Sequence, residues 1–218
     1  MSGDFDTEDV SDFENISPKS GKNMRKKSAY KSGDKRKQSK PITAARLNNI
    51  ALYYLERFSS SAENLRRVLA RRIEKSVYEH GTDKEEGLKA VDEIVERFVE
   101  TGLLNDQLYA RSVAFSQHRA GKSQKAIRMK LASKGVASDV IDAAMSELQE
   151  EIGESSELQA ALSYVRKRRL GPYRIKNRDE KKEKDLAALA RQGFSYDICR
   201  QAIEIETIDE LEAMRILV

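Results

Sequence analysis

The sequence predicts an all-α protein, an elongated curved array of three tandem three-helix modules preceded by a disordered N-terminal tail. Three observations support this class. A short helical motif occurs twice, apolar residues after residue 43 recur at the spacing of helix faces, and no segment shows the alternation of a strand. The expected parts are a tail at 1–43, modules at 44–104, 105–153 and 154–206, and a C-terminal helix at 207–218.

The repeated motif is a helix end followed by the start of another helix. The segment from Leu131 to Met145 recurs fifty-eight residues later, with most paired positions alike in type or size. Each copy has a glycine at the helix end, Gly135 or Gly193, because glycine enters the left-handed conformation without a Cβ penalty. One such unit cannot bury its own apolar face, so the copies are expected to stack. This is typical of helical repeat proteins, which offer a contact surface rather than one catalytic cleft.

The tail consists of an acidic block followed by a basic block. Its apolar residues are too sparse to offset the entropy of ordering, so residues 1–43 are expected to be disordered. Residues 1–46 carry 11 Lys/Arg and 7 Asp/Glu, which accounts for the whole net charge of +4. A solubilising tail and a weak basic arm for nucleic acid both remain open as its role.

Capping residues and glycines predict the helix boundaries of the first module. Apolar residues at positions i, i+3, i+4 and i+7 mark one buried face on each helix. The predicted helices start after Thr43, at the capping-box pattern Ser60–Glu63 and at Thr82–Glu85, and they end near Phe58, His80–Gly81 and Gly102.

The same signals divide the remaining chain. In the second module we expect helices capped by Asn105–Asp106 and by Ser123, broken at Gly121 and Gly135, and a further helix at about 138–152. In the third module we expect helices that start at Ser155 or Ser156, near 177 and at Ser195, with a turn at Leu170–Tyr173 and a last helix after Thr207.

Catalysis, cofactors and metal sites are not expected. His80 and His118 fall near predicted helix ends, where surface positions are usual, and neither has a neighbour at metal-ligand spacing. Cys199, the only cysteine, is predicted to be a buried structural thiol, and a single cysteine favours a reducing, cytoplasmic location. No phosphate-binding loop or apolar run of about 18 residues is present, so neither nucleotide binding nor a membrane span is predicted.

Charge segregation is the strongest binding signal. The segment 107–138 has seven basic residues and no acidic one, and 139–157 has seven acidic residues and no basic one. A second basic cluster follows. Such clusters can bind phosphates or an acidic protein groove, although pairing with the acidic helix remains open. The candidate partner-binding residues are Arg111, Arg119, Lys122, Lys125, Arg128, Lys130, Lys134, Arg166, Lys167, Arg168, Arg169 and Arg174.

Two short segments carry a family resemblance. Gly102-Leu103-Leu104-Asn105-Asp106, followed by Tyr109-Ala110, resembles a signature of the RecX regulatory proteins, and the segment 119–136 resembles their central block. The match covers roughly residues 46–205. About fifteen extra residues near 73–87 and the long tail depart from the family pattern. The signature residues expected to have structural roles are Gly102, Asp106, Tyr109, Ala110, Gly135 and Gly193.

The resemblance implies a non-enzymatic modulator of the RecA recombinase in recombination, DNA repair and the SOS response. Members of the family lie along the groove of the RecA–DNA filament and lower its ATPase, strand-exchange and co-protease activities. The expected partners are therefore the RecA filament and single- or double-stranded DNA, bound by basic helices of a monomer. Two alternatives remain: a helical repeat protein that binds DNA without RecA, and a scaffold for an unrelated partner.

Overall fold

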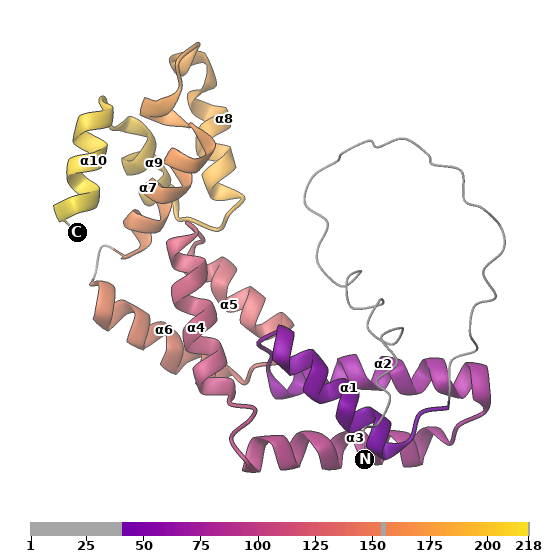
Figure 1. Cartoon of the computed structure of the whole chain (residues 1–218). Helices are drawn as coiled ribbons and strands as arrows, with labels where there is room; N and C mark the ends of the chain where they lie inside the picture. Colours follow the sequence, from indigo (N-terminus) through magenta and orange to yellow (C-terminus); the bar gives the residue numbers. More distant parts are fainter. Residues whose placement is uncertain (1–40, 154–155, 218) are drawn as a thin grey trace, which may run out of the picture. The chain divides into compact units, whose positions relative to one another are not determined.

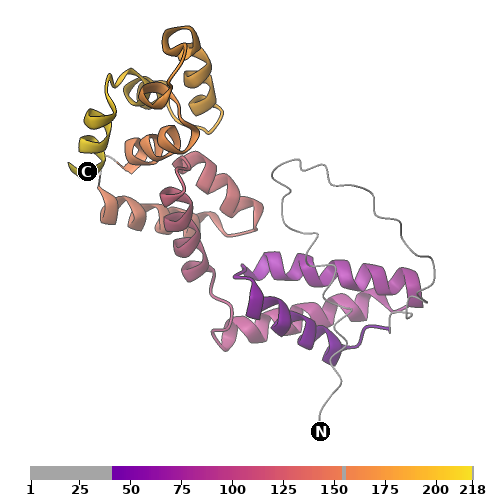
Figure 2. The same cartoon turned by 45° about the horizontal axis from the view of Figure 1, so that its top comes forward.

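The computed structural model describes residues 41–153 and 156–217, and every regular element in these two segments is helical (Figures 1 and 2). The predicted all-α class is confirmed. Most of the predicted tail, residues 1–40, lies outside the described residues. The elements are α1 (Ala44–Arg57), α2 (Ala62–His80), α3 (Lys84–Glu100), α4 (Asp106–Arg119), α5 (Gln124–Ser133), α6 (Ser138–Ile152), α7 (Ser156–Arg168), the short 3-10 helix η2 (Gly171–Tyr173), α8 (Arg178–Ala190), α9 (Tyr196–Glu204) and α10 (Ile208–Leu217).

The described residues form two compact units, and the division runs through α2 and α3. The first unit comprises 41–58 and 68–94, and the second comprises 59–67 and 95–217. Leu47, Leu69 and Ile73 are fully buried in the first unit. The start of α2 therefore belongs to the same unit as α4 to α10.

Side-chain caps begin most of the helices at the predicted positions. Asn105, Ser123 and Ser195 each accept the amide of the residue three positions later. At α2 the structure corrects the prediction by one residue. Ser61 rather than Ser60 accepts this amide, from Asn64, because α2 begins at the next residue.

Glycines end the helices as predicted. Gly102, Gly135 and Gly193 have φ angles of 74°, 74° and 91°, all in the left-handed region. At Gly135 the amide of the following Val136 donates to the Leu131 carbonyl oxygen at 3.2 Å. This bond satisfies a carbonyl of the last turn and places Val136 back on the helix that it follows, where it is buried.

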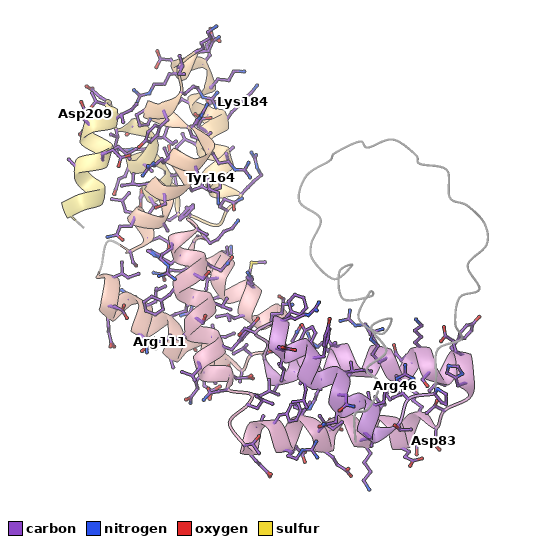
Figure 3. All side chains as sticks on the ribbon, viewed as in Figure 1. Arg46, Asp83, Arg111, Tyr164, Lys184 and Asp209 are labelled. Atoms are coloured by element: carbon purple, nitrogen blue, oxygen red, sulfur yellow. The ribbon has the colours of Figure 1, made fainter. Side chains whose placement is uncertain are left out.

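Helices α4, α5 and α6 enclose one hydrophobic cluster, which includes Ile127, Leu131 and Leu148. Charged residues such as Arg111 of α4 lie outside this cluster (Figure 3). His118, at the end of α4, corrects a prediction, because it is buried rather than on the surface. Its Nε2 lies 2.6 Å from the Ser156 carbonyl oxygen, so α7 covers the end of α4 and Nε2 carries the proton.

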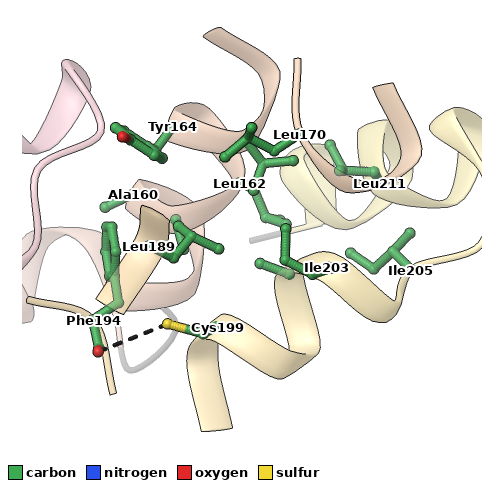
Figure 4. Packing of buried hydrophobic residues seen from close by; sticks show 13 residues of the cluster. Ala160, Leu162, Tyr164, Leu170, Leu189, Phe194, Cys199, Ile203, Ile205 and Leu211 are labelled. Carbon is green, nitrogen blue, oxygen red and sulfur yellow. Dashed lines mark hydrogen bonds between the residues drawn. The ribbon is translucent and has the colours of Figure 1, made fainter. Parts of the chain in front are cut away.

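A second cluster joins α7, α8, α9 and α10 (Figure 4). Leu162, Leu189 and Leu211 are fully buried there, each from a different helix. Cys199 is also buried, and its thiol donates to the Phe194 carbonyl oxygen at 3.8 Å. The prediction of a buried thiol is confirmed, and burial raises its pKa. In the described part of the chain, no helix is long and apolar enough to cross a membrane.

Candidate interaction surface

The start of α2 is held by residues of α4 and α5. The Ser61 hydroxyl accepts the Asn64 amide at 3.2 Å and donates to the Lys134 carbonyl oxygen at 2.5 Å. The Ala62 amide donates to the Asp106 carboxylate at 2.8 Å. The first amides of a helix lack partners within the helix. Here the Ser61 hydroxyl accepts one of these amides, and the Asp106 carboxylate of α4 accepts another. The carbonyl end of α5 therefore lies against the amide end of α2.

The start of α5 has the same arrangement, with partners from α7 and from the end of α8. The Ser123 hydroxyl accepts the Ala126 amide at 3.1 Å and donates to the Gln192 carbonyl oxygen at 2.5 Å. The Gln124 amide donates to the Glu157 carboxylate at 3.0 Å. Glu157 lies in the first turn of α7, as Asp106 lies in the first turn of α4. Burial raises the pKa of Glu157, and the bond from Gln124 opposes that rise.

We call each of these two arrangements a joint. At one joint the end of α5 meets the start of α2, and at the other the end of α8 meets the start of α5. The negative end of one helix dipole thus lies near the positive end of the next, which is a favourable arrangement. Helices α8, α5 and the first turns of α2 therefore follow one another head to tail.

The joints also explain where several family-signature residues lie. Asp106 supplies the carboxylate of the first joint, while Tyr109 and Ala110 are buried in the cluster of α4 to α6. A side chain at Gly135 would place its Cβ 2.6 Å from the Cβ of Glu63. A side chain at Gly193 would place its Cβ 2.9 Å from the Ser123 hydroxyl oxygen. Both glycines therefore allow close contact at a joint as well as a left-handed turn.

Two arginines of the basic segment pair with the acidic helix. Arg111 lies 3.0 Å from the Glu147 carboxylate and 3.5 Å from that of Glu151, and Arg128 pairs with Asp142. All three carboxylates belong to α6. These two arginines therefore pair with the acidic helix, which is the alternative that the sequence left open. The pairs are exposed, so each contributes only about 0–1 kcal/mol.

Arg174 is held inside the second unit by Asp185. The guanidinium donates to the two carboxylate oxygens at 2.9 and 2.5 Å, and the Gly171 amide donates to the same carboxylate at 3.0 Å. Asp185 is only 2% exposed. A buried carboxylate requires a cation and hydrogen-bond donors, so the Arg174 side chain has a role within the fold.

The other candidate basic residues divide by their surroundings. Arg166 lies 3.8 Å from Glu212, and the Arg168 guanidinium lies 5.9 Å from the centre of the Tyr164 ring. Nζ of Lys122 and of Lys134 donate to side-chain amide oxygens. In the segments that the structure describes, no carboxylate lies at ion-pair distance from Arg119, Lys122, Lys125, Lys130, Lys134, Lys167, Arg168 or Arg169.

Arg67 and Glu157 hold the joints but were not among the predicted site residues. The Arg67 guanidinium donates to the Ser133 carbonyl oxygen at 2.9 Å, at the end of α5, and Glu157 holds the start of α5. One signal in the sequence points to the joints. A serine precedes the second helix of each of the first two predicted modules, and an acidic residue lies in the first turn of the helix that begins the next predicted module. Each of these residues alone looks like an ordinary helix cap.

A cavity of about 350 Å³ opens beside α8 and the end of α9. Its basic residues are occupied within the fold: Lys182 pairs with Glu204 at 2.9 Å, and Arg178 donates to the Glu206 carbonyl oxygen at 2.7 Å. Across residues 41–153 and 156–217, no group of His, Cys, Asp and Glu side chains is placed to hold a metal ion. The more prominent feature of this unit is its charged surface.

Comparison with known proteins identifies close relatives. A family model described as "RecX, second three-helix domain" matches residues 105–145. A protein of Myxococcus xanthus (strain DK1622) named "Regulatory protein RecX" is 39% identical over 178 residues, which cover 78% of this chain and 94% of that protein. A protein of the same name from Agrobacterium fabrum (strain C58) is 34% identical over 162 residues, which cover 73% and 82%.

Solved structures share the fold. The crystal structure of RecX from Lactobacillus salivarius has a TM-score of 0.51 and 21% identity, and the match covers 80% of this chain and 97% of that one. A second crystal structure, of regulatory protein RecX, has a TM-score of 0.51 and 22% identity.

Proposed function

This chain belongs to the RecX family of regulatory proteins, and we propose that it regulates the RecA recombinase by binding the RecA–DNA filament and lowering its activity. The observation that carries the proposal is the 39% identity to a regulatory protein over 94% of that protein's length. The relatives are named as regulators rather than enzymes, which supports action by binding. The proposed readouts are the ATPase, strand-exchange and co-protease activities of RecA.

We further propose that the filament is bound by basic residues that have no carboxylate partner in the described fold. Arg119, Lys125 and Lys167 are exposed and meet this condition. Arg111, Arg128 and Arg174 pair with carboxylates of this chain, so we leave them out of the contact set. A chain that contacts adjacent RecA subunits would bind through several modest contacts acting together.

The test measures the DNA-dependent ATPase rate of RecA with and without the full chain. We expect the wild-type chain to lower this rate, and a triple variant, Arg119→Glu, Lys125→Glu and Lys167→Glu, to lose most of the inhibition. A matched variant, Lys84→Glu, Lys89→Glu and Lys184→Glu, makes the same change in net charge at other exposed positions and should inhibit normally. An ATPase rate that the wild-type chain leaves unchanged would refute the proposed function.

A further inference from the structure

Three lysines form a row along α5. Lys122 immediately precedes the N-cap of this helix, Lys130 lies in its last turn, and Lys134 is its C-cap. The helical rise of about 1.5 Å per residue separates Ser123 from Lys130 by about 10 Å and Lys130 from Lys134 by about 6 Å, and Lys122 lies one extended residue before Ser123. The row is therefore about 18 Å long.

The three ammonium groups influence one another. Partial burial, followed by charge repulsion from Lys134 and then from Lys122, lowers the pKa of Lys130. Lys130 and Lys134 are four residues apart at the end of α5, so their side chains lie on one face of the helix. Like charges at this range repel, and an anion bound to the row would relieve the repulsion.

The outer two lysines are positioned by neutral groups at the two joints. The Lys122 ammonium donates to the side-chain oxygen of Gln192 at 3.0 Å, and the Lys134 ammonium donates to that of Asn64 at 3.1 Å. None of the three row lysines lies at ion-pair distance from a carboxylate in the described residues. A neutral amide oxygen fixes an ammonium group without cancelling its charge, whereas a carboxylate would cancel most of it.

The arginines of the same segment behave differently. Arg111 and Arg128 pair with carboxylates of α6, so their charges are largely compensated within the fold. The planar guanidinium matches a carboxylate with two parallel bonds, and a lysine is instead a compact point charge that suits phosphate. The uncompensated charge of this helix is thus on lysines, which are Lys125 and the three lysines of the row, and two of the row lysines are already held in place.

We propose that Lys122, Lys130 and Lys134 bind the phosphate backbone of a DNA strand, with Gln192 and Asn64 as positioning residues. At about 3.4 Å per nucleotide of a duplex strand, the row has the length of about five nucleotides, enough to meet several phosphates. Backbone contacts of this kind carry no sequence information, so binding is independent of base sequence. This inference rests on the proposed function, because the DNA strand that the row binds would be that of the RecA–DNA filament.

The test uses the full chain and a labelled thymine-only oligonucleotide, without RecA. Fluorescence anisotropy at several salt concentrations gives the slope of log K against log salt. We expect Lys130→Gln to reduce the slope by about 0.7, and the triple variant Lys122→Gln, Lys130→Gln and Lys134→Gln to reduce it by about 2. The single variant changes an exposed side chain that makes no hydrogen bond or ion pair with the described residues, so it remains informative if the triple variant unfolds.

Two controls separate a positioned row from net charge. Lys84→Gln, Lys89→Gln and Lys184→Gln removes the same charge from exposed positions elsewhere, and it should retain nearly the wild-type slope. Gln192→Met leaves the net charge unchanged but removes the acceptor of Lys122, and we expect it to weaken binding severalfold. Circular dichroism melting checks that each variant is folded.

Several outcomes would overturn the proposal. One is an equal loss of oligonucleotide binding in the two lysine triples, and another is unchanged binding in the folded row variant. A third is a row variant that loses inhibition of RecA but binds the oligonucleotide normally, because the row would then face an acidic protein surface. Failure of the proposed function is a separate result. In that case the wild-type chain leaves the ATPase rate of RecA unchanged, whatever the oligonucleotide data show.

Discussion

At the residue scale, the same residue types have different roles according to what surrounds them. Gly102 and Gly135 both have a φ of 74°, yet a side chain at Gly102 would meet nothing within 4 Å and one at Gly135 would meet Glu63. Arg174 and Lys167 are both basic, yet one holds a buried carboxylate and the other is exposed without a carboxylate partner in the described residues. Residue identity alone does not separate these cases.

The glycine contrast leads to a stability prediction. Gly102→Ala should lower the free energy of unfolding by about 1 kcal/mol, the cost of forcing a Cβ into the left-handed region. Gly135→Ala should cost clearly more, because the Cβ must also displace Glu63 at the joint. Urea denaturation of the two variants and the wild type measures the difference. Equal losses at the two positions would mean that the joint at Gly135 is not closely packed.

At the element scale, α5 is the helix on which the second unit is organised. The Ser123 hydroxyl at its start donates to the Gln192 carbonyl oxygen at the end of α8, and the Lys134 carbonyl oxygen at its end accepts from the Ser61 hydroxyl at the start of α2. Ser123 therefore makes two kinds of bond, one that caps α5 and one to the Gln192 carbonyl oxygen. Ser195 provides the control, because its hydroxyl caps α9 at 3.4 Å and is exposed.

The two serines should respond differently to the same substitution. Ser195→Ala should cost about 1 kcal/mol, which is typical of a lost helix cap. Ser123→Ala should cost about 1 kcal/mol more, because the part-buried Gln192 carbonyl oxygen loses its donor as well. Thermal melting followed by circular dichroism compares the two variants with the wild type. A Ser123 variant no less stable than the Ser195 variant would contradict the two-bond role of Ser123.

At the scale of the whole molecule, several reactive side chains have roles within the described fold. Its most buried carboxylate, Asp185, is occupied by Arg174, its cysteine is buried in a hydrophobic cluster, and its buried histidine binds a backbone carbonyl. The positive charge of the second unit divides into residues paired within the fold and residues that are not. This division favours action through contact with a partner of opposite charge.

Action by contact predicts a stoichiometric effect. Inhibition of RecA should saturate at a fixed ratio of this chain to RecA, and the chain alone should not hydrolyse ATP. Titration of the chain against a constant amount of RecA and DNA measures the ratio, and phosphate release without RecA measures hydrolysis. Hydrolysis by the purified chain that a point substitution in it abolishes would show that the chain does not act by contact alone.

Much of the fold could be predicted because its causes are local. The end of α5 depends on Gly135 and its immediate neighbours, and the start of α4 depends on the Asn105 side chain and an amide three residues later. The family resemblance at Gly102–Ala110 was also visible in the sequence, and the relatives extend it over most of the chain. His118 shows the limit of local signals, because a neighbouring helix, α7, covers it.

The sequence by itself determined the helices, their caps and glycine ends, and the segregation of charge, since these follow from backbone sterics and hydrogen bonds within one turn. Only the tertiary structure decided which charges remain uncompensated. The bonds of the first joint connect residues 44 and 73 positions apart, and the partners of Arg111 lie on another helix. Such partners are set by helix packing, which places side chains distant in sequence within a few ångströms, and no periodicity in the sequence records that placement.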